Sequence, residues 1–408
     1  MDHMILRREA FSKLKPSYFF STIAKLRREY EEKHPDKKVL SLGIGDAVLP
    51  LVSGLKKPLE SLIDQMLTQK GFVGYGDAPG WKNLREKIAV HYLKNVDKEE
   101  IFVTNGAKSS LLQLQNFFSQ VKSVGIISPT YPVYADGSLM QGIETIHHLP
   151  LLAENDFYYD LSRAPEMDLL YLCHPNNPTG TTLTTQQLTK WVDICRERNI
   201  ILIVDNAYSA YIQSENSCKT IYSIPGARDV AIEINSFSKS LGFSGVRGGW
   251  VVFPKNLKYK GGTSMHSDWT RFYSTTFNGA NIFAQQGMLA FFNSDVNQQA
   301  KAQAAYYMDN AKKLKTWFLN LGFKVYGGEN APYVWVDVSP LDGWEFFQYM
   351  LEEKQIVVVP GEGFGKEGKN FVRLSSFVGE QDLKEIEKRL FEKPLHLKQW
   401  SSKERACR

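Results

Sequence analysis

The sequence has few cysteines and no long hydrophobic run. Its four cysteines show no CxxC spacing, and Cys173 and Cys195 fall in apolar segments. This pattern favours free thiols in a reducing compartment over a disulfide framework or a zinc site. No stretch approaches the roughly 18 consecutive apolar residues of a membrane span, and the N-terminus has no apolar leader segment. We therefore expect no membrane association and a cytoplasmic location.

Strong charge of one sign is also lacking. The net charge is only +5, and the basic residues are scattered along the chain. The short run of Lys25, Arg27 and Arg28 is typical of a solvated helix face, so no nucleic-acid partner is expected. His147 and His148 are adjacent on an expected strand and would point to opposite faces, which predicts no metal site. No repeat or low-complexity segment is visible, and 408 residues suffice for a large core and a smaller one.

Short apolar strands alternate with helical patterns through the middle of the chain. A helical pattern with a threonine cap spans residues 184–199. Continuous apolar strands separated by helices indicate a mostly parallel sheet that helices cover on both faces. The sequence thus predicts an α/β fold. The expected strands lie at residues 101–104, 124–128, 168–175, 200–205, 230–235 and 249–254.

The pattern changes after about residue 290. A long helical pattern leads to expected strands at 332–338, 356–361 and 371–377, with helices at 343–354 and at the end. We interpret residues 46–290 as a large domain and 291–395 as a small α+β domain. The N-terminal segment 1–45, with a helix around 20–33, would join the small domain, and 396–408 would be a tail.

Polar residues cluster where the apolar strands end, which is where parallel sheets bind ligands. "HPNNPTG" (174–180) follows one strand and "VDNAYSAY" (204–211) follows the next. "NSFSKSLGFSGVRGGW" (235–250) places Lys239 among serines, eight residues before Arg247. Taken singly, Asn177 could serve a turn, Asp205 could cap a helix and Tyr131 could merely pack. Arg373, in an apolar strand, could pair with an internal carboxylate.

Together these residues match the needs of pyridoxal phosphate (PLP) chemistry. A lysine amine forms a Schiff base with an aldehyde, and an aspartate keeps a ring nitrogen protonated. Tyrosine and asparagine can hydrogen-bond the phenolic oxygen of the ring. "TNGAKSS" (104–110) offers a helix N-terminus for a phosphate, and Ser236, Ser238 and Arg247 add donors to it. Lys239, Asp205 and Tyr208 are the expected catalytic residues.

The combined motifs resemble the fold-type I, class I/II PLP-dependent aminotransferases. The motifs are "GYGDAPGWKNLREKIA", "TNGAKSS", "SPTYPVY", "HPNNPTG", "VDNAYSAY", "NSFSKSLGFSGVRGGW" and "FVRLSS", in order over roughly residues 40–390. The resemblance implies a PLP-binding large domain and a homodimer with shared active sites. It implies that these residues hold the cofactor: Ala107, Lys108, Tyr131, Asn177, Asp205, Tyr208, Ser236, Ser238, Lys239, Arg247 and, from the partner subunit, Tyr75. Arg373 would bind the α-carboxylate of the substrate, with the backbone N–H of Gly45 beside it.

A narrower resemblance is to the LL-diaminopimelate aminotransferases. It is carried by "SYFFSTI" (17–23), "LGIGD" (42–46), "EINSFSK" (233–239) and "TTFNGANIFAQQG" (275–287). It implies that Tyr18 and Asn278 of the partner subunit act with Lys108 on the far end of the substrate, beside Tyr131 and Asn177. The family commonly has an acidic residue where this chain has Ala78, one place after Asp77, and hydroxyl residues where this chain reads "AVLP".

The expected function is transamination of LL-diaminopimelate with 2-oxoglutarate. An aminotransferase for an aromatic, dicarboxylic or other amino acid stays open as the alternative, because Ala78 opposes the first reading while Asn278 and Lys108 favour it. A PLP lyase and a PLP-binding regulator are further alternatives. The roughly 40 residues before "LGIGD" are few for an appended DNA-binding module.

Overall fold

The computed structural model describes residues 7–92 and 96–395, so the expected tail 396–408 lies outside the described residues. The helices are α1 (Phe19–Lys33), α2 (Lys56–Met66), α3 (Lys82–Tyr92), α4 (Ala107–Phe117), α5 (Val133–Gln141), α6 (Thr185–Arg198), α7 (Met265–Thr276), α8 (Ile282–Ala290), α9 (Ser294–Asn320), α10 (Gly343–Lys354) and α11 (Glu380–Glu392). The strands are β1 (Leu40–Ser41), β2 (Ile101–Thr104), β3 (Ser123–Ser128), β4 (Thr145–Pro150), β5 (Leu169–Cys173), β6 (Ile201–Asp205), β7 (Ala231–Ser236), β8 (Gly249–Val252), β9 (Lys324–Gly327), β10 (Tyr333–Asp337), β11 (Ile356–Val357), β12 (Val359–Pro360) and β13 (Phe371–Ser375).

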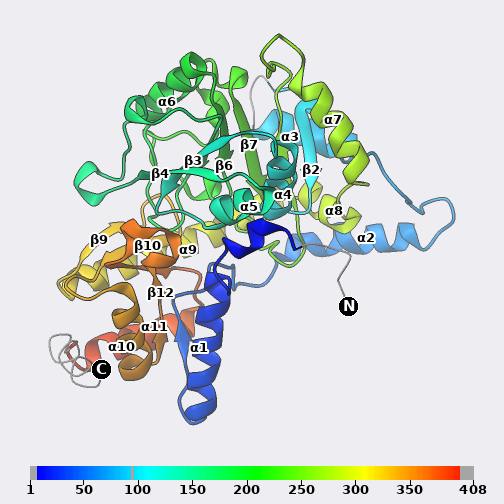
Figure 1. The fold of residues 1–408 in the computed structure, drawn as a ribbon. Helices are drawn as coiled ribbons and strands as arrows, with labels where there is room; N and C mark the ends of the chain where they lie inside the picture. The colour runs from blue at the N-terminus through cyan, green and yellow to red at the C-terminus, as the bar shows by residue number, and fades with distance from the viewer. Residues whose placement is uncertain (1–6, 93–95, 396–408) are drawn as a thin grey trace, which may run out of the picture.

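Within the described residues, a seven-stranded sheet forms the centre of the molecule, in the order β2-β8-β7-β6-β5-β3-β4. Neighbours from β7 to β4 pair in parallel, and β8 runs antiparallel to both β7 and β2. Helices lie on both faces of this sheet (Figure 1). Every residue of β5 and β7 is buried, as the continuous apolar runs predict. The expected mostly parallel α/β sheet is confirmed.

Local signals in the sequence explain where helices begin and end. In α6, the Thr184 hydroxyl accepts a hydrogen bond from the Gln187 N–H and the Gln187 side chain bonds back, and the helix ends at left-handed Asn199. Asp342 and Glu345 make the same reciprocal cap at the start of α10. Such capping boxes satisfy backbone donors that a helix N-terminus leaves unpaired.

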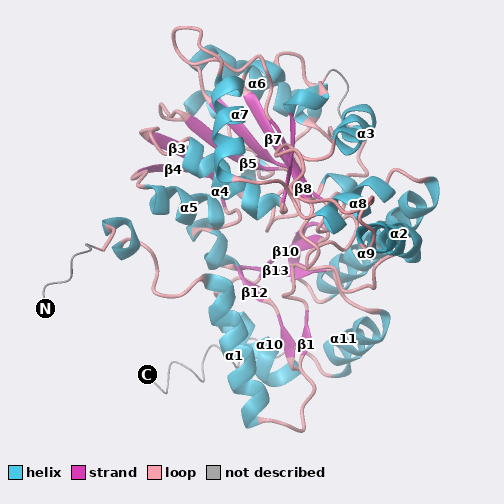
Figure 2. Ribbon diagram, turned by 90° about the vertical axis from the view of Figure 1, so that its right-hand side faces the viewer, coloured by secondary structure: helices cyan, strands magenta, loops and turns pink. Residues whose placement is uncertain are grey.

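A second, antiparallel sheet has the order β12-β13-β10-β9 and lies below the large sheet in Figure 2. Residues 356–361, expected as one strand, form two. β11 pairs in parallel with β1, while β12 pairs with β13. Pro360 ends the second piece, since proline donates no ladder hydrogen bond. Because β1 precedes the large sheet in sequence, its pairing with β11 ties the N-terminal segment to the C-terminal part of the chain.

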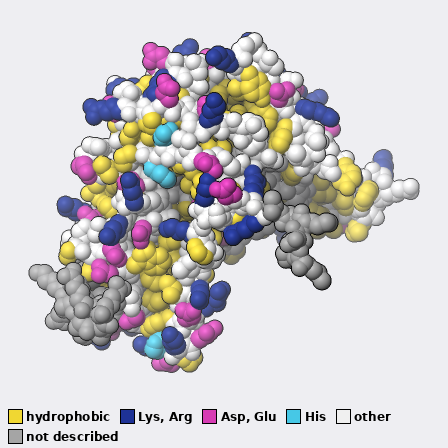
Figure 3. Space-filling model, in the orientation of Figure 1, with side chains coloured by type: hydrophobic (Ala, Val, Ile, Leu, Met, Phe, Trp, Pro, Cys, Tyr) yellow, Lys and Arg dark blue, Asp and Glu magenta, His cyan; other side chains and the backbone are white. Residues whose placement is uncertain are grey.

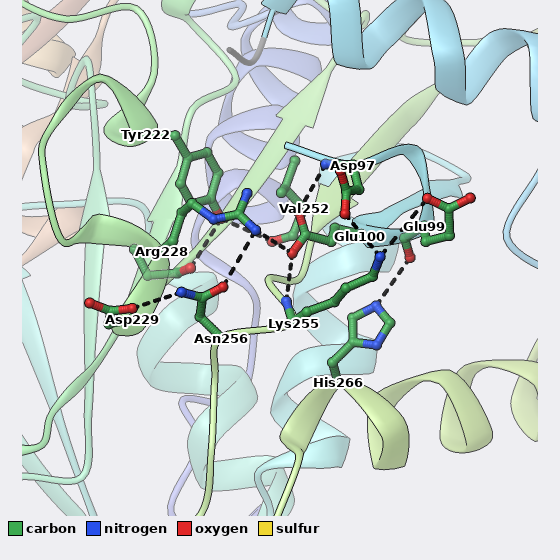
Figure 4. A network of polar contacts seen from close by, with 11 residues as sticks. Asp97, Glu99, Glu100, Tyr222, Arg228, Asp229, Val252, Lys255, Asn256 and His266 are labelled. Carbon is green, nitrogen blue, oxygen red and sulfur yellow. Dashed lines mark hydrogen bonds and ion pairs between the residues drawn. The ribbon is translucent and has the colours of Figure 1, made fainter. Parts of the chain in front are cut away.

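A buried carboxylate fastens the antiparallel edge of the large sheet. Glu100, which precedes β2 and is fully buried, accepts hydrogen bonds from the Arg228 guanidinium at 2.7 Å and the Lys255 N–H at 2.6 Å (Figure 4). Its second oxygen accepts from the Asp97 N–H at 3.0 Å. These bonds join the segments that precede β2 and β7, the two neighbours of β8. They therefore hold β8, which begins two residues after Arg247, in place.

No helix of the described ranges is long and apolar enough to cross a membrane.

Candidate active site

A cavity of about 370 Å³ opens at the carboxyl ends of the parallel strands. β6 ends on Asp205, whose register neighbours are Cys173 on β5 and Ile234 on β7, so the loops after these strands meet at one edge. The cavity brings together most of the residues predicted from sequence. They are Gly45, Ala107, Lys108, Tyr131, Asn177, Asp205, Tyr208, Ser236, Ser238, Lys239, Arg247 and Arg373.

One end of the cavity suits an anion. Helix α4 begins at Ala107, and its N-cap Gly106 (φ +87°) supplies no side-chain cap, which leaves the first helical amides for a ligand. A Cβ on Gly106 would lie 2.6 Å from Nη2 of Arg247, so only glycine lets this guanidinium approach the helix start. Ser236 and Ser238 line the same cavity. A phosphate would meet amide, hydroxyl and guanidinium donors here.

Asp205 also lines the cavity and is buried. The Tyr134 hydroxyl donates to its Oδ2 at 2.8 Å, and the Ala207 N–H donates to its Oδ1 at 3.3 Å. Burial raises the pKa of Asp205, and these two hydrogen bonds oppose the rise. A cationic partner, such as a protonated heterocyclic nitrogen, would stabilise the ionised form of this carboxylate further.

Lys239 lines the same cavity with its side chain mostly buried. Nζ donates to Asp46 Oδ1 at 3.1 Å, and its backbone carbonyl accepts from the Tyr211 hydroxyl at 2.7 Å. Burial lowers the pKa of Lys239; Asp46 opposes this, whereas the positive charges of Arg373 and Arg247 add to it. A lysine with a lowered pKa is a better nucleophile and proton acceptor near neutral pH.

Arg373 on β13 is 1% exposed, and it makes no salt bridge in the part of the chain that the structure describes. Nη1 donates to Asn177 Oδ1 at 2.8 Å and Nη2 to the Gly43 carbonyl at 2.9 Å, while Nε has no hydrogen-bond partner. The guanidinium lies 4.6 Å from the ring of Tyr333. The interpretation of Arg373 as the partner of an internal carboxylate is therefore wrong, and its charge is available to an anionic ligand.

The two asparagines of "HPNNPTG" have different surroundings. Asn176 donates from Nδ2 to the Pro129 carbonyl and to Thr179 Oγ1, so it serves the turn. Asn177 lines the cavity and receives the Arg373 hydrogen bond. Tyr208 also reaches the cavity, and its hydroxyl lies 2.8 Å from that of Tyr333.

Three predicted site residues lie outside this cavity. Tyr18 lies near Lys108 of its own chain, whose Nζ is 5.0 Å from the centre of the Tyr18 ring, and the expectation that the partner subunit supplies Tyr18 stays a prediction. Tyr75 and Asn278 are exposed and line a separate surface recess of about 280 Å³ together with Asp77. A single chain does not bring them to the cavity.

The structure adds residues that the sequence reasoning missed. Asp46, Ser244, Tyr134 and Tyr333 all line the cavity. Asp46 and Ser244 bond each other beside Lys239, and their motifs "LGIGD" and "SLGFSGVR" were recognised without a role for these two residues. Tyr134 stands three residues after Tyr131, but its contact is to a strand 71 residues later. No sequence signal singles out Tyr333 within its apolar strand.

These residues fit PLP. The phosphate suits the start of α4 with Arg247, the ring nitrogen suits Asp205, and the aldehyde suits Lys239. Lys108, Lys239, Arg247 and Arg373 outnumber the two carboxylates of the cavity, which suits a phosphate and a substrate carboxylate.

Comparison with known proteins supports the same assignment. Residues 37–390 match the family model "Aminotransferase class I and II". The chain is 39% identical over 392 residues to an LL-diaminopimelate aminotransferase of Protochlamydia amoebophila, covering 93% of this chain and 95% of the relative. It is 42% identical over 383 residues to one of Agathobacter rectalis, covering 90% and 94%.

A solved structure, the L,L-diaminopimelate aminotransferase from Chlamydomonas reinhardtii, matches with a TM-score of 0.92 at 40% identity and covers 96% of this chain and 99% of that one. The fold-type I architecture expected from the motifs is thereby confirmed, and PLP is the cofactor of these enzymes. The chain belongs to the class I and II aminotransferases and is a PLP-dependent transaminase.

Proposed function

We propose that the chain transfers the amino group of LL-diaminopimelate to 2-oxoglutarate, or catalyses the reverse reaction. The observation that carries this proposal is the match, at about 40% identity over nearly the whole chain, to relatives named for that substrate. The site supports it, because the Lys108 ammonium lies near the rings of both Tyr18 and Tyr131. This cluster can take the far carboxylate of a long diacid.

The proposed role of each residue follows from its place in the cavity. Bound PLP would supply an electron sink that makes the α-proton of an amino acid removable. Arg373 would hold the α-carboxylate by two parallel hydrogen bonds, using Nε and an Nη group. Neutral Lys239 would accept the α-proton of the amino acid at Nζ. It would later donate this proton back from the same face of the cofactor. Tyr208 and Asn177 would donate to the phenolic oxygen of the ring, and Tyr131 would pack on its face.

The alternative is an aminotransferase for a different amino acid. By the resemblance, Ala78 and the apolar Ala47, Val48 and Leu49 stand where the diaminopimelate family commonly has acidic and hydroxyl residues. Asp77 shares the surface recess with Asn278, and we propose that it replaces the missing carboxylate toward the distal ammonium of the substrate.

We further propose a homodimer with shared active sites. Tyr75 is 91% exposed, and Leu67 and Phe72, on the same projecting segment, are 81% and 65% exposed. Hydrophobic side chains gather on this arm at the right of Figure 3. So much exposed apolar surface is typical of a protein interface. A second copy packed on it by two-fold symmetry could bring its Tyr75, Asp77 and Asn278 to this cavity.

We also retain the proposed division into segments 1–45, 46–290 and 291–395, because β1 pairs with β11 and β9–β13 include a separate antiparallel sheet.

We also propose a cytoplasmic location. Cys173, Cys195 and Cys218 are free thiols, which supports this location.

The substrate is tested by the visible spectrum of PLP-loaded protein, with LL-diaminopimelate added in the absence of any oxo acid. Conversion of the bound cofactor to its aminated form supports the proposal. A spectrum that responds to glutamate or to an aromatic amino acid, but not to LL-diaminopimelate, would assign the alternative substrate class.

Shared sites are tested by mixing two inactive variants, Lys239→Ala and Tyr75→Ala. A mixed dimer contains one site with both native residues, so subunit exchange should restore activity. No recovery, with exchange shown by tagged subunits, would contradict the shared site.

A further inference from the structure

The buried contact between Tyr134 and Asp205 has no counterpart in the roles assigned above. Tyr134 lies in the first turn of α5 with 1% of its surface exposed. Its hydroxyl donates to Oδ2 of Asp205 at 2.8 Å, and its ring stacks on Tyr171 at 5.5 Å with an interplanar angle of 14°. The stack and the helix fix the hydroxyl in one position.

The hydrogen bond runs in one direction. Burial raises the pKa of Tyr134 well above its usual value, so the phenol keeps its proton and donates it. A phenol that donates stabilises the ionised carboxylate more than the protonated acid. Since Oδ2 is occupied in this way and the Ala207 N–H lies at Oδ1, the carboxylate cannot rotate freely.

No other side chain of the described residues does this for Asp205. The neighbour on β5 is Cys173, and burial raises the pKa of its thiol to about 12, so it is uncharged. No lysine or arginine forms an ion pair with Asp205 in residues 7–92 and 96–395. Tyr134 is therefore the side-chain donor that opposes protonation of this carboxylate.

We propose that Tyr134 is a positioning residue that keeps Asp205 ionised and oriented, so that the shared proton resides on the ring nitrogen of the cofactor rather than on the carboxylate. Without the phenol, the neutral pair of a protonated acid and an unprotonated ring nitrogen becomes favoured in this buried site. This inference rests on the proposed role of Asp205 but not on the identity of the amino-acid substrate.

The test is the ¹⁵N chemical shift of PLP labelled at the ring nitrogen, bound to the wild type, Tyr134→Phe, Asp205→Asn and Tyr171→Phe. Phenylalanine keeps the stacked ring and removes only the hydroxyl. Tyr171→Phe is the matched control, because its buried hydroxyl has no hydrogen-bond partner among the described residues. Circular dichroism checks that each variant is folded.

We expect the resonance of Tyr134→Phe to move from the wild-type position toward that of Asp205→Asn, while Tyr171→Phe stays at the wild-type position. We also expect PLP to bind about tenfold or more weakly to Tyr134→Phe, as for loss of a hydrogen bond to a charged group. A wild-type resonance in Tyr134→Phe would overturn the inference alone. A wild-type resonance in Asp205→Asn would overturn the role of Asp205, and the inference with it.

Discussion

Replacing Arg373 by leucine should remove the recognition of substrate carboxylate. Arg373 is buried and lines the cavity, donates from Nη1 and Nη2 to Asn177 and Gly43, and has no hydrogen-bond partner at Nε. Breaking a buried charge pair by removing one partner costs about 3–5 kcal/mol. At about 1.4 kcal/mol per factor of ten, kcat/KM for the amino acid should fall by two to three powers of ten or more.

Arg373→Lys separates charge from geometry. Lysine keeps the positive charge but offers a single ammonium in place of the planar fork, so it cannot serve Asn177, Gly43 and a carboxylate together. We expect kcat/KM between those of the wild type and Arg373→Leu. The assay is single-turnover amination of the bound cofactor over a range of amino-acid concentrations, which separates binding from the chemical step.

The control is another buried cation, Lys354. Its Nζ donates to the carbonyls of Arg389 and Lys393 at 2.8 and 2.7 Å, at the end of α11 and away from the cavity. Lys354→Met should lower stability and leave the concentration dependence of the half-reaction unchanged. If Arg373→Leu showed wild-type kcat/KM, or if Lys354→Met matched it in amino-acid binding, the role of Arg373 in substrate binding would be refuted.

Three further changes test the site and the fold. Lys239→Ala should abolish turnover while the protein still binds PLP, measured by steady-state assay and equilibrium dialysis; persistent turnover would remove Lys239 from the reaction. Asp46→Asn should lower the pKa of Lys239 further, because Asp46 opposes the effect of burial, so the acid limb of kcat/KM against pH should move to lower pH. A limb that stays or moves to higher pH would contradict this coupling. Glu100→Ala should cost about 3–5 kcal/mol of stability by urea unfolding, whereas Lys255→Met, which breaks only the exposed ion pairs with Asp97 and Glu99, should cost about 1 kcal/mol or less.

Most strands were predictable to within about two residues because their signal is local, but β1 and β9 were not expected. Residues 101–104 form β2 as expected, and 343–354 form α10, since apolar periodicity and capping residues act within a few positions. The division of residues 356–361 between two sheets was not predictable in this way. It depends on which strand each half meets, and β1 and β13 come from distant parts of the chain.

The residues of the site could likewise be predicted only where their signal is local in the sequence. Asp205, Lys239 and Arg247 were found because each stands in a distinctive short motif at a strand end. Tyr134 and Tyr333 were missed because what distinguishes them is a contact, to Asp205 and to Tyr208, made only after folding. Tyr75 and Asn278 were recognised by resemblance alone, and one chain leaves them on the surface.

Burial pushes both Asp205 and Lys239 toward their uncharged forms, and the fold opposes this with a different partner for each. Asp205 accepts a hydrogen bond from the buried Tyr134 phenol, which stays un-ionised because burial raises its pKa. Since this donor carries no charge, salt does not screen the interaction. Lys239 has Asp46, whose side chain is 49% exposed, so solvent and ions screen its charge. In the proposed roles, Asp205 would keep its charge while it pairs with the ring nitrogen, whereas Lys239 would lose and regain a proton, which its weaker, screened partner permits. The buried partner Tyr134 therefore suits the proposed fixed charge of Asp205, and the exposed partner Asp46 suits the proposed proton transfer by Lys239.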